Sequence, residues 1–360
     1  MKFGAMIAPR ISDWEILKHA EDLGYDHGWV PDSQMIWSDC YAVLALAAAN
    51  TNRIRLGTGV AIAPTRLAPV TAHSIASINQ IAPGRTFLGI GTGHTAMRVM
   101  GMKPMSGREF RDYLEVVHGL LNGQEVEYTY RDRKRAIRFL HEGMGFIDVE
   151  QRVEIYVAAN GPIALRAAGE FGDGRISGGN ERTDRLQQSL GIIREGAERS
   201  GRTLPDDFHT AALTYACVLK PGENIDSDRV IDEVGSMVGS MLHGWWERYT
   251  NTGDDAFVPD SCRDEWVDYL AYLEQHPIPA EKRYQAVHDG HCTYLVPEER
   301  RFITPSVIRT GNALIGEPDA IIDQLRRLEA AGLKEVTLLP PMARARENFS
   351  EFAENVMSRY

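Results

Sequence analysis

Cysteine is scarce in this chain of 360 residues. The four cysteines, Cys40, Cys217, Cys262 and Cys292, lie far apart, and none belongs to a Cys-x-x-Cys pair. This spacing argues against a zinc ribbon, a thioredoxin-type redox pair and a disulfide scaffold, because each of these needs cysteines that are closely paired or dense in the chain. We expect four reduced thiols with structural roles.

Long apolar runs are also missing. No segment approaches the roughly 18 uninterrupted apolar residues of a membrane-spanning helix. The N-terminal MKFGAMIAPRISDWE reaches an arginine and then acids before the core of a signal peptide could develop. The composition, 43% hydrophobic and 25% charged, is typical of soluble globular proteins. We therefore predict a cytoplasmic protein that does not associate with membranes.

Concentrated positive charge is the third absence. The formal net charge is −11, and the one dense basic run is RDRKR at 131–135. Binding of nucleic acid needs a concentrated positive surface, so no nucleic-acid partner is expected. We interpret 131–135 as the solvent-exposed tip of a hairpin between VEYTY and AIRFL; the alternative is contact with an anionic ligand or tail.

Short β-type runs alternate with segments of helical period along most of the chain, which is the pattern of parallel βαβ units. Eight such strand segments can be counted. This number predicts an α/β protein built as a (β/α)8 TIM barrel. The segments are 2–9, 25–32, 53–64, 85–93, 154–161, 175–180, 209–220 and the end of 320–341.

A doubly wound dinucleotide-binding sheet is the competing architecture. It would require GxGxxG between the first strand and the first helix, where this chain has APRISDWE. GIGTGH at 89–94 follows the fourth strand and has no matching acid about 20 residues further on. The barrel is therefore the favoured prediction.

One stretch, 237–309, lacks a clear period and gathers tryptophans, prolines and histidines. Long irregular segments inside a compact domain are often lids or pocket walls. We therefore predict a single domain, 1–360, in which 237–309 is an insertion near the barrel mouth. HDGH at 288–291 places two histidines three residues apart, but no third ligand follows at a suitable spacing, so no metal site is expected.

The ends of the predicted strands are rich in glycine and small polar residues. In (β/α)8 enzymes these carboxyl ends face one shared mouth, where the reacting groups lie. Glycine there allows the backbone to approach a flat ligand closely. Among these strand ends are 8–9, 31–34, 59–61, 92–94, 159–162, 178–180, 218–219 and 340–341.

Several segments together resemble a known family. They are WVPDSQMIW, RIRLGTGVAIAPTRLAPVTAHSIASINQIAPGRTFLGIGTG, YVAANGPIALRAAGEFGDG and LIGEPDAIIDQLRRLEAAGLKEVTLLP. The chain is similar to the luciferase-like superfamily, and within it to the coenzyme F420-dependent branch that includes methylenetetrahydromethanopterin reductase. The resemblance covers nearly the whole chain except the insertion, and it implies a TIM barrel of the bacterial luciferase-like type with insertions.

The function that the resemblance implies is hydride transfer between C5 of coenzyme F420 and a small organic substrate, such as an enone, imine, carbonyl or alcohol. The cofactor supplies this chemistry, while the protein aligns the reactants and handles the proton. Two alternatives stay open, an FMN-dependent monooxygenase and a flavin-binding paralogue without turnover. A homodimer is also expected from the resemblance.

The resemblance assigns roles residue by residue. Asp32 would lie beside the cofactor ring, Trp37 would wall the substrate space, and Gly59-Val60 would be a non-prolyl cis peptide behind the ring. We expect Asp32, His94 and Trp37 to serve catalysis. The full set expected to contact the cofactor is Asp32, Ser33, Gly59, Val60, Thr92, Gly93, His94, Ala159, Asn160, Gly161, Pro162, Gly178 and Gly179.

Two of these positions depart from the sugar-phosphate dehydrogenases of the family. Ser33 stands where those enzymes have histidine, and His94 where they have glutamate. His94 could handle a proton near neutral pH or simply cap a turn, and Asp32 could instead be a helix N-cap. Glu181 would repel a phosphate, so glucose 6-phosphate is not the expected substrate.

Overall fold

The computed structural model describes residues 1–178, 183–311 and 313–360 and forms a closed parallel barrel. The strands follow the order β3-β2-β1-β13-β10-β9-β8-β5-β4, and the pairing of β3 with β5 closes the ring. This confirms the predicted TIM barrel and its eight strand positions. The strands are β1 (Lys2–Met6), β2 (His27–Val30), β3 (Arg55–Thr58), β4 (Ala61–Ile62), β5 (Thr86–Gly91), β8 (Glu154–Ala158), β9 (Gly174–Ser177), β10 (His209–Thr214) and β13 (Glu335–Leu338).

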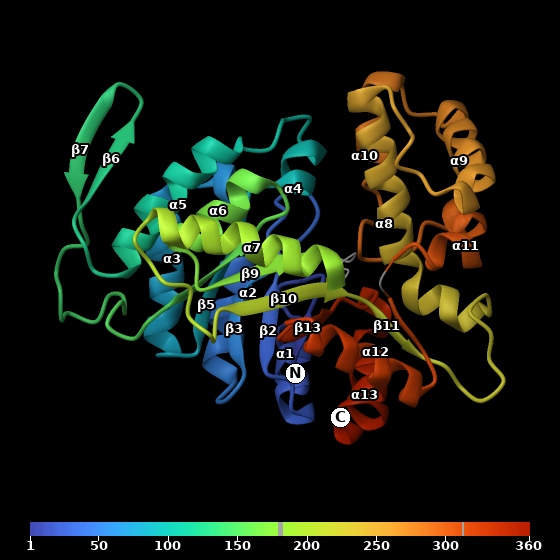
Figure 1. Cartoon of the computed structure of the whole chain (residues 1–360), viewed down its shortest axis with the longest axis horizontal. Coiled ribbons are helices and arrows are strands. Elements are labelled where there is room, and N and C mark those ends of the chain that lie inside the picture. Colours follow the sequence, from blue (N-terminus) through green and yellow to red (C-terminus); the bar gives the residue numbers. More distant parts are fainter. Residues whose placement is uncertain (179–182, 312) are drawn as a thin grey trace.

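Helices surround the barrel and bury the outer faces of its strands (Figure 1). Strands covered on both sides read as continuous apolar runs rather than alternating ones, and all six residues of β5 are buried. The helices of this layer are α1 (Trp14–Leu23), α2 (Cys40–Asn50), α3 (Ala68–Ile81), α4 (His94–Val99), α5 (Gly107–Leu121), α6 (Pro162–Phe171), α7 (Thr183–Arg199), α12 (Pro318–Ala330) and α13 (Ala345–Asn355). In the described part of the chain, no helix combines the length and the apolar character needed to cross a membrane.

The third barrel strand is interrupted, and this interruption shapes the mouth. β3 and β4 both pair with β5, and between them lies the cis peptide Gly59-Val60 that the family resemblance implied. Gly59 packs against the barrel interior, because a Cβ there would come within 2.7 Å of Met6 and 2.9 Å of Trp29. A side chain is therefore excluded at this point of the strand.

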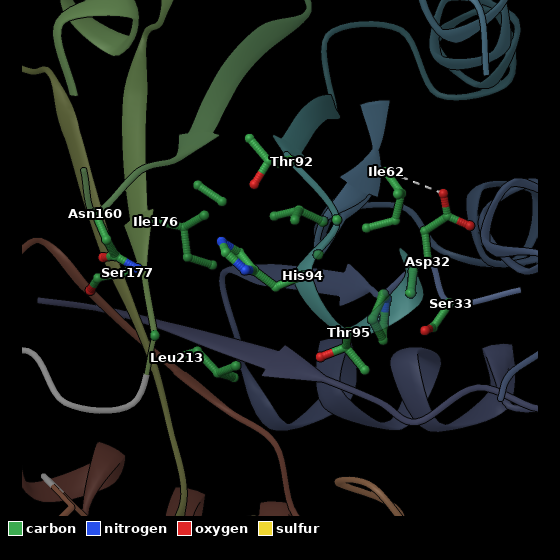
Figure 2. Close-up of a pocket in the computed structure, with 18 of the residues that line it drawn as sticks. Asp32, Ser33, Ile62, Thr92, His94, Thr95, Asn160, Ile176, Ser177 and Leu213 are labelled. Carbon is green, nitrogen blue, oxygen red and sulfur yellow. Dashed lines mark hydrogen bonds between the residues drawn. The ribbon is translucent and has the colours of Figure 1, made fainter. Parts of the chain in front are cut away.

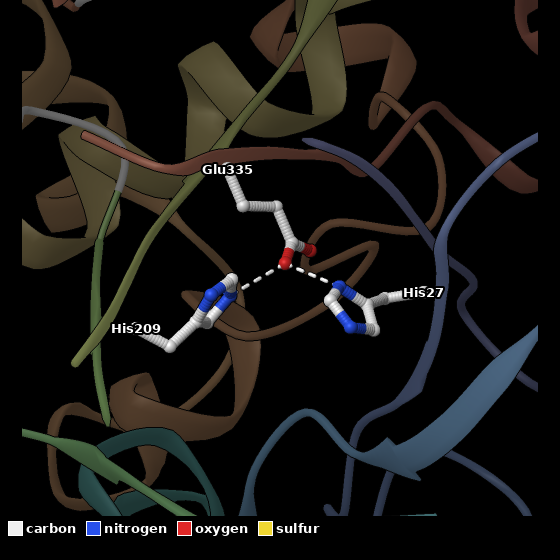
Figure 3. Close-up of side chains that lie close together, drawn as sticks. All are labelled: His27, His209 and Glu335. Atoms are coloured by element: carbon white, nitrogen blue, oxygen red, sulfur yellow. Dashed lines mark hydrogen bonds and ion pairs between the residues drawn. The ribbon is translucent and has the colours of Figure 1, made fainter. Parts of the chain in front are cut away.

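The opposite, amino-terminal end of the barrel interior holds a cluster of three ionisable side chains, His27, His209 and Glu335, which we call the floor cluster (Figure 3). Each is the first residue of its strand, and all three are buried. Glu335 accepts hydrogen bonds from His27 Nδ1 at 2.5 Å and His209 Nε2 at 2.7 Å, and also from Trp29 and Thr337. These bonds tie three strands together.

A helical excursion leaves the barrel after β10 and is closed by the parallel pair β11 (Ala216–Val218) and β12 (Leu314–Gly316). It stands to one side of the barrel (Figure 1). Its helices are α8 (Asp228–Thr252), α9 (Arg263–Gln275), α10 (Arg283–Ala286) and α11 (Pro305–Ile308). Our expectation that the period is lost over 237–309 was wrong for most of this stretch. Glycines such as Gly235, Gly239 and Gly244 lower helix propensity, but α8 is stabilised by packing.

A hairpin of β6 (Val126–Tyr130) and β7 (Arg133–Ile137) extends away from the barrel at the opposite side (Figure 1). Its tip is Arg131-Asp132, and the basic side chains of β7 are exposed, which confirms the predicted solvent-exposed hairpin. Six short 3-10 helices complete the described elements. They are η1 (Ala63–Thr65), η2 (Asp260–Cys262), η3 (Ala280–Lys282), η4 (Pro297–Phe302), η5 (Met342–Arg344) and η6 (Met357–Arg359).

Candidate functional site

A cavity of about 550 Å³ lies at the carboxyl ends of the barrel strands. This volume is in the range of pockets that hold cofactors and other small ligands. It brings together most of the residues that the sequence predicted for the site. Those lining it are Asp32, Ser33, Trp37, Gly59, Val60, Thr92, Gly93, His94, Asn160, Gly161, Pro162 and Gly178.

Glycines form much of the wall and leave room beside the backbone. A Cβ at Gly161 or Gly178 would meet no protein atom within 4 Å, so a side chain at either position would extend into the cavity. Gly93 adopts φ of 82°, a left-handed conformation that glycine accepts most readily. Gly161 is also the N-cap of α6, where unpaired N–H groups and the helix dipole favour an anionic group. Gly179 lies outside the described residues.

Asp32 is buried at the end of β2 and is held by three protein groups. Its Oδ2 accepts hydrogen bonds from Ile62 N at 3.1 Å and Arg66 Nη1 at 2.5 Å, and its Oδ1 accepts one from Gln34 Nε2 at 2.6 Å. Figure 2 shows its carboxylate directed toward Ile62. Burial raises the pKa of Asp32, with Arg66 opposing that shift. The carboxylate thus fixes β4, directly after the cis peptide.

His94 begins α4 and projects into the cavity. In Figure 2 its imidazole lies between Asn160 on one side and Ile62 on the other. Partial enclosure and the neighbouring Arg98 guanidinium both lower the pKa of His94. The neutral imidazole therefore predominates near pH 7, and it can accept a proton at one nitrogen while it donates from the other.

Asn160 is positioned by a buried side chain that the sequence analysis missed. Arg175, on β9, donates from Nε to the carbonyl of Ala159 at 2.8 Å and from Nη2 to Asn160 Oδ1 at 3.3 Å. Ala159 itself is buried and does not line the cavity. It follows strand β8 with its side chain in the core behind the wall, and its carbonyl helps to hold Arg175 beside Asn160.

Ser33 carries an unsatisfied polar atom at the cavity wall. Ser33 is 3% exposed, and its Oγ has no hydrogen-bond partner in the structure. The neighbouring Gln34 uses its amide nitrogen on Asp32, while its Oε1 has no partner. Buried polar groups are nearly always hydrogen-bonded, so the Ser33 hydroxyl is suited to a polar ligand edge, whereas Gln34 does not line the cavity.

The excursion contributes the remaining wall. Trp37 lines the cavity and donates from Nε1 to Thr293 Oγ1 at 2.9 Å, and its ring centroid is 6.3 Å from that of His291. His291 and Cys292 line the cavity from the excursion side. His291 Nε2 is 3.4 Å from Thr95 Oγ1, and its Nδ1 is buried without a partner.

Two further histidines flank His291, each beside a carboxylate. Its ring centroid is 6.5 Å from that of His243 and 5.7 Å from that of His288. His243 Nε2 is 2.9 Å from Glu299 Oε2, and His288 Nε2 is 3.1 Å from Glu247 Oε1. Burial first, and then the two neighbouring imidazoles, lower the pKa of His291 to about 3. His291 is therefore neutral at physiological pH.

Sequence reasoning found the barrel-loop part of the site and missed His291, Cys292 and Arg175. The first two lie in the excursion, nearly 200 positions from the loop residue Thr95 that His291 approaches. The HDGH motif at 288–291 was the available signal for His291, but its spacing suggested only a metal site. For Arg175, no motif distinguishes an arginine that supports a loop from one that faces solvent.

Comparisons with known proteins agree with this geometry. The chain is 28% identical over 364 residues to 5,10-methylenetetrahydromethanopterin reductase of Methanopyrus kandleri, which covers 93% of this chain and 90% of that protein. It is 33% identical over 234 residues to F420-dependent glucose-6-phosphate dehydrogenase of Kineococcus radiotolerans, which covers 61% of this chain and 67% of that protein.

Solved structures with the same fold include two types of enzyme. One is the coenzyme F420-dependent tetrahydromethanopterin reductase of Methanopyrus kandleri, with a TM-score of 0.69 and 22% identity over 100% of this chain and 99% of that one. Another is the oxygenating constituent of 3,6-diketocamphane monooxygenase of Pseudomonas putida in complex with FMN, with a TM-score of 0.61 and 17% identity over 100% and 98%.

A family model described as luciferase-like monooxygenase matches residues 13–335, which span the barrel from α1 to the start of β13. The match includes the loops with the cis peptide, the glycine wall and the excursion between β11 and β12. The barrel, its interrupted third strand and this match together place the chain in the luciferase-like monooxygenase family.

Proposed function

We propose that this protein is a coenzyme F420-dependent oxidoreductase that acts on a small organic substrate. The observation that carries the proposal is the cavity at the barrel mouth, with its glycine wall and the unpartnered Ser33 hydroxyl. These features fit a flat heterocycle with polar edges and an anionic tail. Two of these relatives, the glucose-6-phosphate dehydrogenase and the tetrahydromethanopterin reductase, are named as F420-dependent. Their names favour the deazaflavin over FMN.

The protein's residues would bind and orient the reactants. Ser33 and Asn160 offer polar groups to the ring edge, and the N-terminus of α6 at Gly161 suits the anionic tail. Asp32 positions β4 behind the ring. When bound, the cofactor supplies or accepts a hydride at C5. His94 holds or accepts the accompanying proton at an imidazole nitrogen.

The segment 237–309 would serve as the lid of this site, within the single domain 1–360. Support comes from the contacts that join it to the barrel loops. Trp37 donates to Thr293, Arg98 pairs with Glu247, and His291 lines the cavity. A wall of this kind excludes water from the reacting groups. The variant Glu247→Gln tests the lid more cleanly than a deletion would. It removes the ion pair with Arg98 and should raise the rate of cofactor release.

Titration of the purified protein with F420 and with FMN, followed by fluorescence, tests the proposal. Saturable F420 binding is expected, and Gly161→Leu should abolish it because the new side chain would occupy the cavity. The matched control is Gly191→Leu on α7, where a Cβ also meets no protein atom but which does not line the cavity at the barrel mouth. FMN binding without F420 binding would contradict the proposal.

The FMN-dependent monooxygenase is the second candidate, because the fold is shared with an FMN-bound monooxygenase. It predicts oxygen consumption with reduced FMN. An oxygen electrode distinguishes it from the first candidate, for which F420 reduction by an alcohol, or its reverse, proceeds without oxygen uptake.

We further propose a homodimer located in the cytoplasm as the working form. Three strongly exposed apolar side chains, Leu140, Met144 and Phe146, are available for an interface near the hairpin. Light scattering after gel filtration measures the mass directly. A single 40.2 kDa species at micromolar concentration would contradict the dimer.

A further inference from the structure

The cavity provides little positive charge for an anionic substrate. Among the described residues that line it, none is lysine or arginine, and the one charged side chain is Asp32. The guanidinium nearest to that carboxylate, Arg66, pairs with both Asp32 and Asp39 and does not line the cavity. A carboxylate or phosphate on the substrate would have to lose water without gaining an ion pair there, which is costly.

The cavity combines a polar group from the excursion with apolar side chains from the barrel. His291 presents the polar group, and its neutral imidazole can donate one hydrogen bond and accept another. Among the residues that the structure describes, the side-chain partner of this ring is Thr95, whose Oγ1 lies 3.4 Å from His291 Nε2. The apolar side chains that line the same cavity are Met105, Ile163, Ile176, Leu213 and Leu339.

Burial and the two flanking imidazoles keep His291 neutral, and each flanking imidazole has a carboxylate of its own. His243 is engaged by Glu299, and His288 by Glu247, so each acid faces one of the flanking imidazoles. Arg98 also pairs with Glu247, and Tyr269 donates to Glu299. In the described part of the chain both acids pair with side chains other than His291, whose Nδ1 has no protein partner.

We propose that His291 is a substrate-binding residue and that the substrate is an uncharged alcohol or carbonyl compound with an apolar body. This inference rests on the proposed function and specifies its substrate class. In the reducing direction, the carbonyl carbon gains the hydride from the reduced deazaflavin, the π pair of the C=O bond moves to oxygen, and that oxygen takes the proton held by His94. His291 donates a hydrogen bond to the same oxygen while negative charge develops on it.

The test uses two probes of similar shape, cyclohexanone and cyclohexanecarboxylate, at pH 7.5. Protein labelled with ¹⁵N-histidine is titrated with each, with and without F420, and the His291 ring signals are identified by their loss in His291→Phe. We expect cyclohexanone to shift these signals and to bind at least about tenfold more tightly than the carboxylate. His291→Phe should weaken cyclohexanone binding about tenfold, as expected for a lost hydrogen bond to a desolvated group.

Two further variants serve as controls for the loss of the hydrogen-bond donor and for the effect of a histidine substitution elsewhere. His291→Asn keeps a donor near the Nδ1 position and should retain tighter cyclohexanone binding than His291→Phe. His73→Phe, on the exposed face of α3, should leave binding unchanged. Circular dichroism and thermal melting establish that each variant is folded.

Three results would overturn the inference: equal or tighter binding of cyclohexanecarboxylate, unchanged cyclohexanone binding in His291→Phe, or binding of neither probe. The proposed function is judged separately by F420 fluorescence in the same samples. A protein that binds no F420 would refute that function, while the titrations without cofactor would still decide the assignment of His291.

Discussion

At the floor of the barrel Glu335 accepts hydrogen bonds from four side chains, whereas at the mouth Ser33 Oγ and His291 Nδ1 have no protein partner. Both regions are buried and polar. The floor cluster satisfies its carboxylate internally, which is what stability requires of a buried charge. The mouth leaves polar atoms unsatisfied beside a cavity, which is what binding requires.

One polar atom of the floor cluster has no hydrogen-bond partner, but its surroundings differ from those of the unpartnered atoms at the mouth. His27 Nε2 lacks a hydrogen-bond partner, but His27 borders a small surface hollow lined also by polar residues such as Lys2, Asp26 and Arg53. The cavity at the mouth is larger than this hollow and has a much more apolar lining. It also contains the predicted catalytic residues. In TIM barrels the amino-terminal end serves stability and the carboxyl end serves chemistry, and the bonding of the two regions follows this division.

The largest expected effect breaks the floor cluster. Glu335→Gln places an amide where four donors converge, and we expect a loss of about 3–5 kcal/mol in the free energy of unfolding. Burial alone would raise the pKa of Glu335, but His27 and His209 outweigh it and lower the pKa well below its usual value. The carboxylate therefore stabilises the fold above the unfolded-state pKa of about 4.3, and this contribution is lost as pH falls through the folded-state pKa.

Urea denaturation followed by circular dichroism measures this loss, with the exposed Glu150→Gln as control. Binding of F420 to the folded Glu335→Gln protein should be unchanged. Weaker cofactor binding at full folding, or a loss below about 1 kcal/mol, would show that the two ends are not separated as we argue.

The next effect lies at the mouth. His94→Gln should lower the rate of the F420-dependent reaction by about 10²–10⁴-fold, the usual contribution of a general acid or base. Because burial and Arg98 lower the pKa of His94, alcohol oxidation, which needs the neutral imidazole, should slow only as pH falls through that lowered pKa. Carbonyl reduction, which needs the protonated form, should slow as pH rises through it.

Arg98→Met sharpens this prediction, because removal of the guanidinium should move the pH limb upward. The control is His118→Gln on the outer helix α5, whose pKa is also lowered by burial but which does not line the cavity at the barrel mouth. A pH limb that persists in His94→Gln would assign the proton to another group.

A smaller effect tests the link between the excursion and stability. The pKa of His291 is about 3, below the unfolded value of about 6.5, so the unfolded chain binds the proton more readily. The wild type should lose stability relative to His291→Asn by about 1.4 kcal/mol per pH unit as pH falls from about 6 to 4, and the difference should level off above 6.5. Urea unfolding at several pH values measures it; parallel curves would mean that His291 is solvated.

The sequence predicted the barrel because its signals are local: eight β-type runs, most of them followed by a helical period, with glycine or small polar residues at the strand ends. The positions of Gly59-Val60 and of Thr92 to His94 followed from the family resemblance. The helix α8 was missed because its glycines obscure the helical pattern. His291 was missed because it reaches the cavity by tertiary packing alone, and its partner Thr95 is 196 positions away.

The floor cluster could not be predicted for the same reason. His27, His209 and Glu335 begin three different strands, and His27 and Glu335 are 308 positions apart. Each residue alone suggests a strand end at the surface. Only the closure of the barrel places their side chains in one interior, where a shared carboxylate becomes favourable.

The smallest expected effect tests whether an unsatisfied hydroxyl at the mouth is reserved for a ligand. Ser33→Ala removes an Oγ that bonds to no protein group, so stability should change by less than about 0.5 kcal/mol, while F420 binding should weaken by about 1 kcal/mol, or roughly fivefold. Ser236→Ala on α8 is the matched control, because Ser236 Oγ is also buried without a partner but does not line the cavity at the mouth. Fluorescence titration measures the affinity of both variants for F420. Weaker binding in Ser33→Ala alone would tie the unsatisfied hydroxyl to the cofactor. Equal affinities would mean that the hydroxyl at the mouth is no more functional than the one in α8.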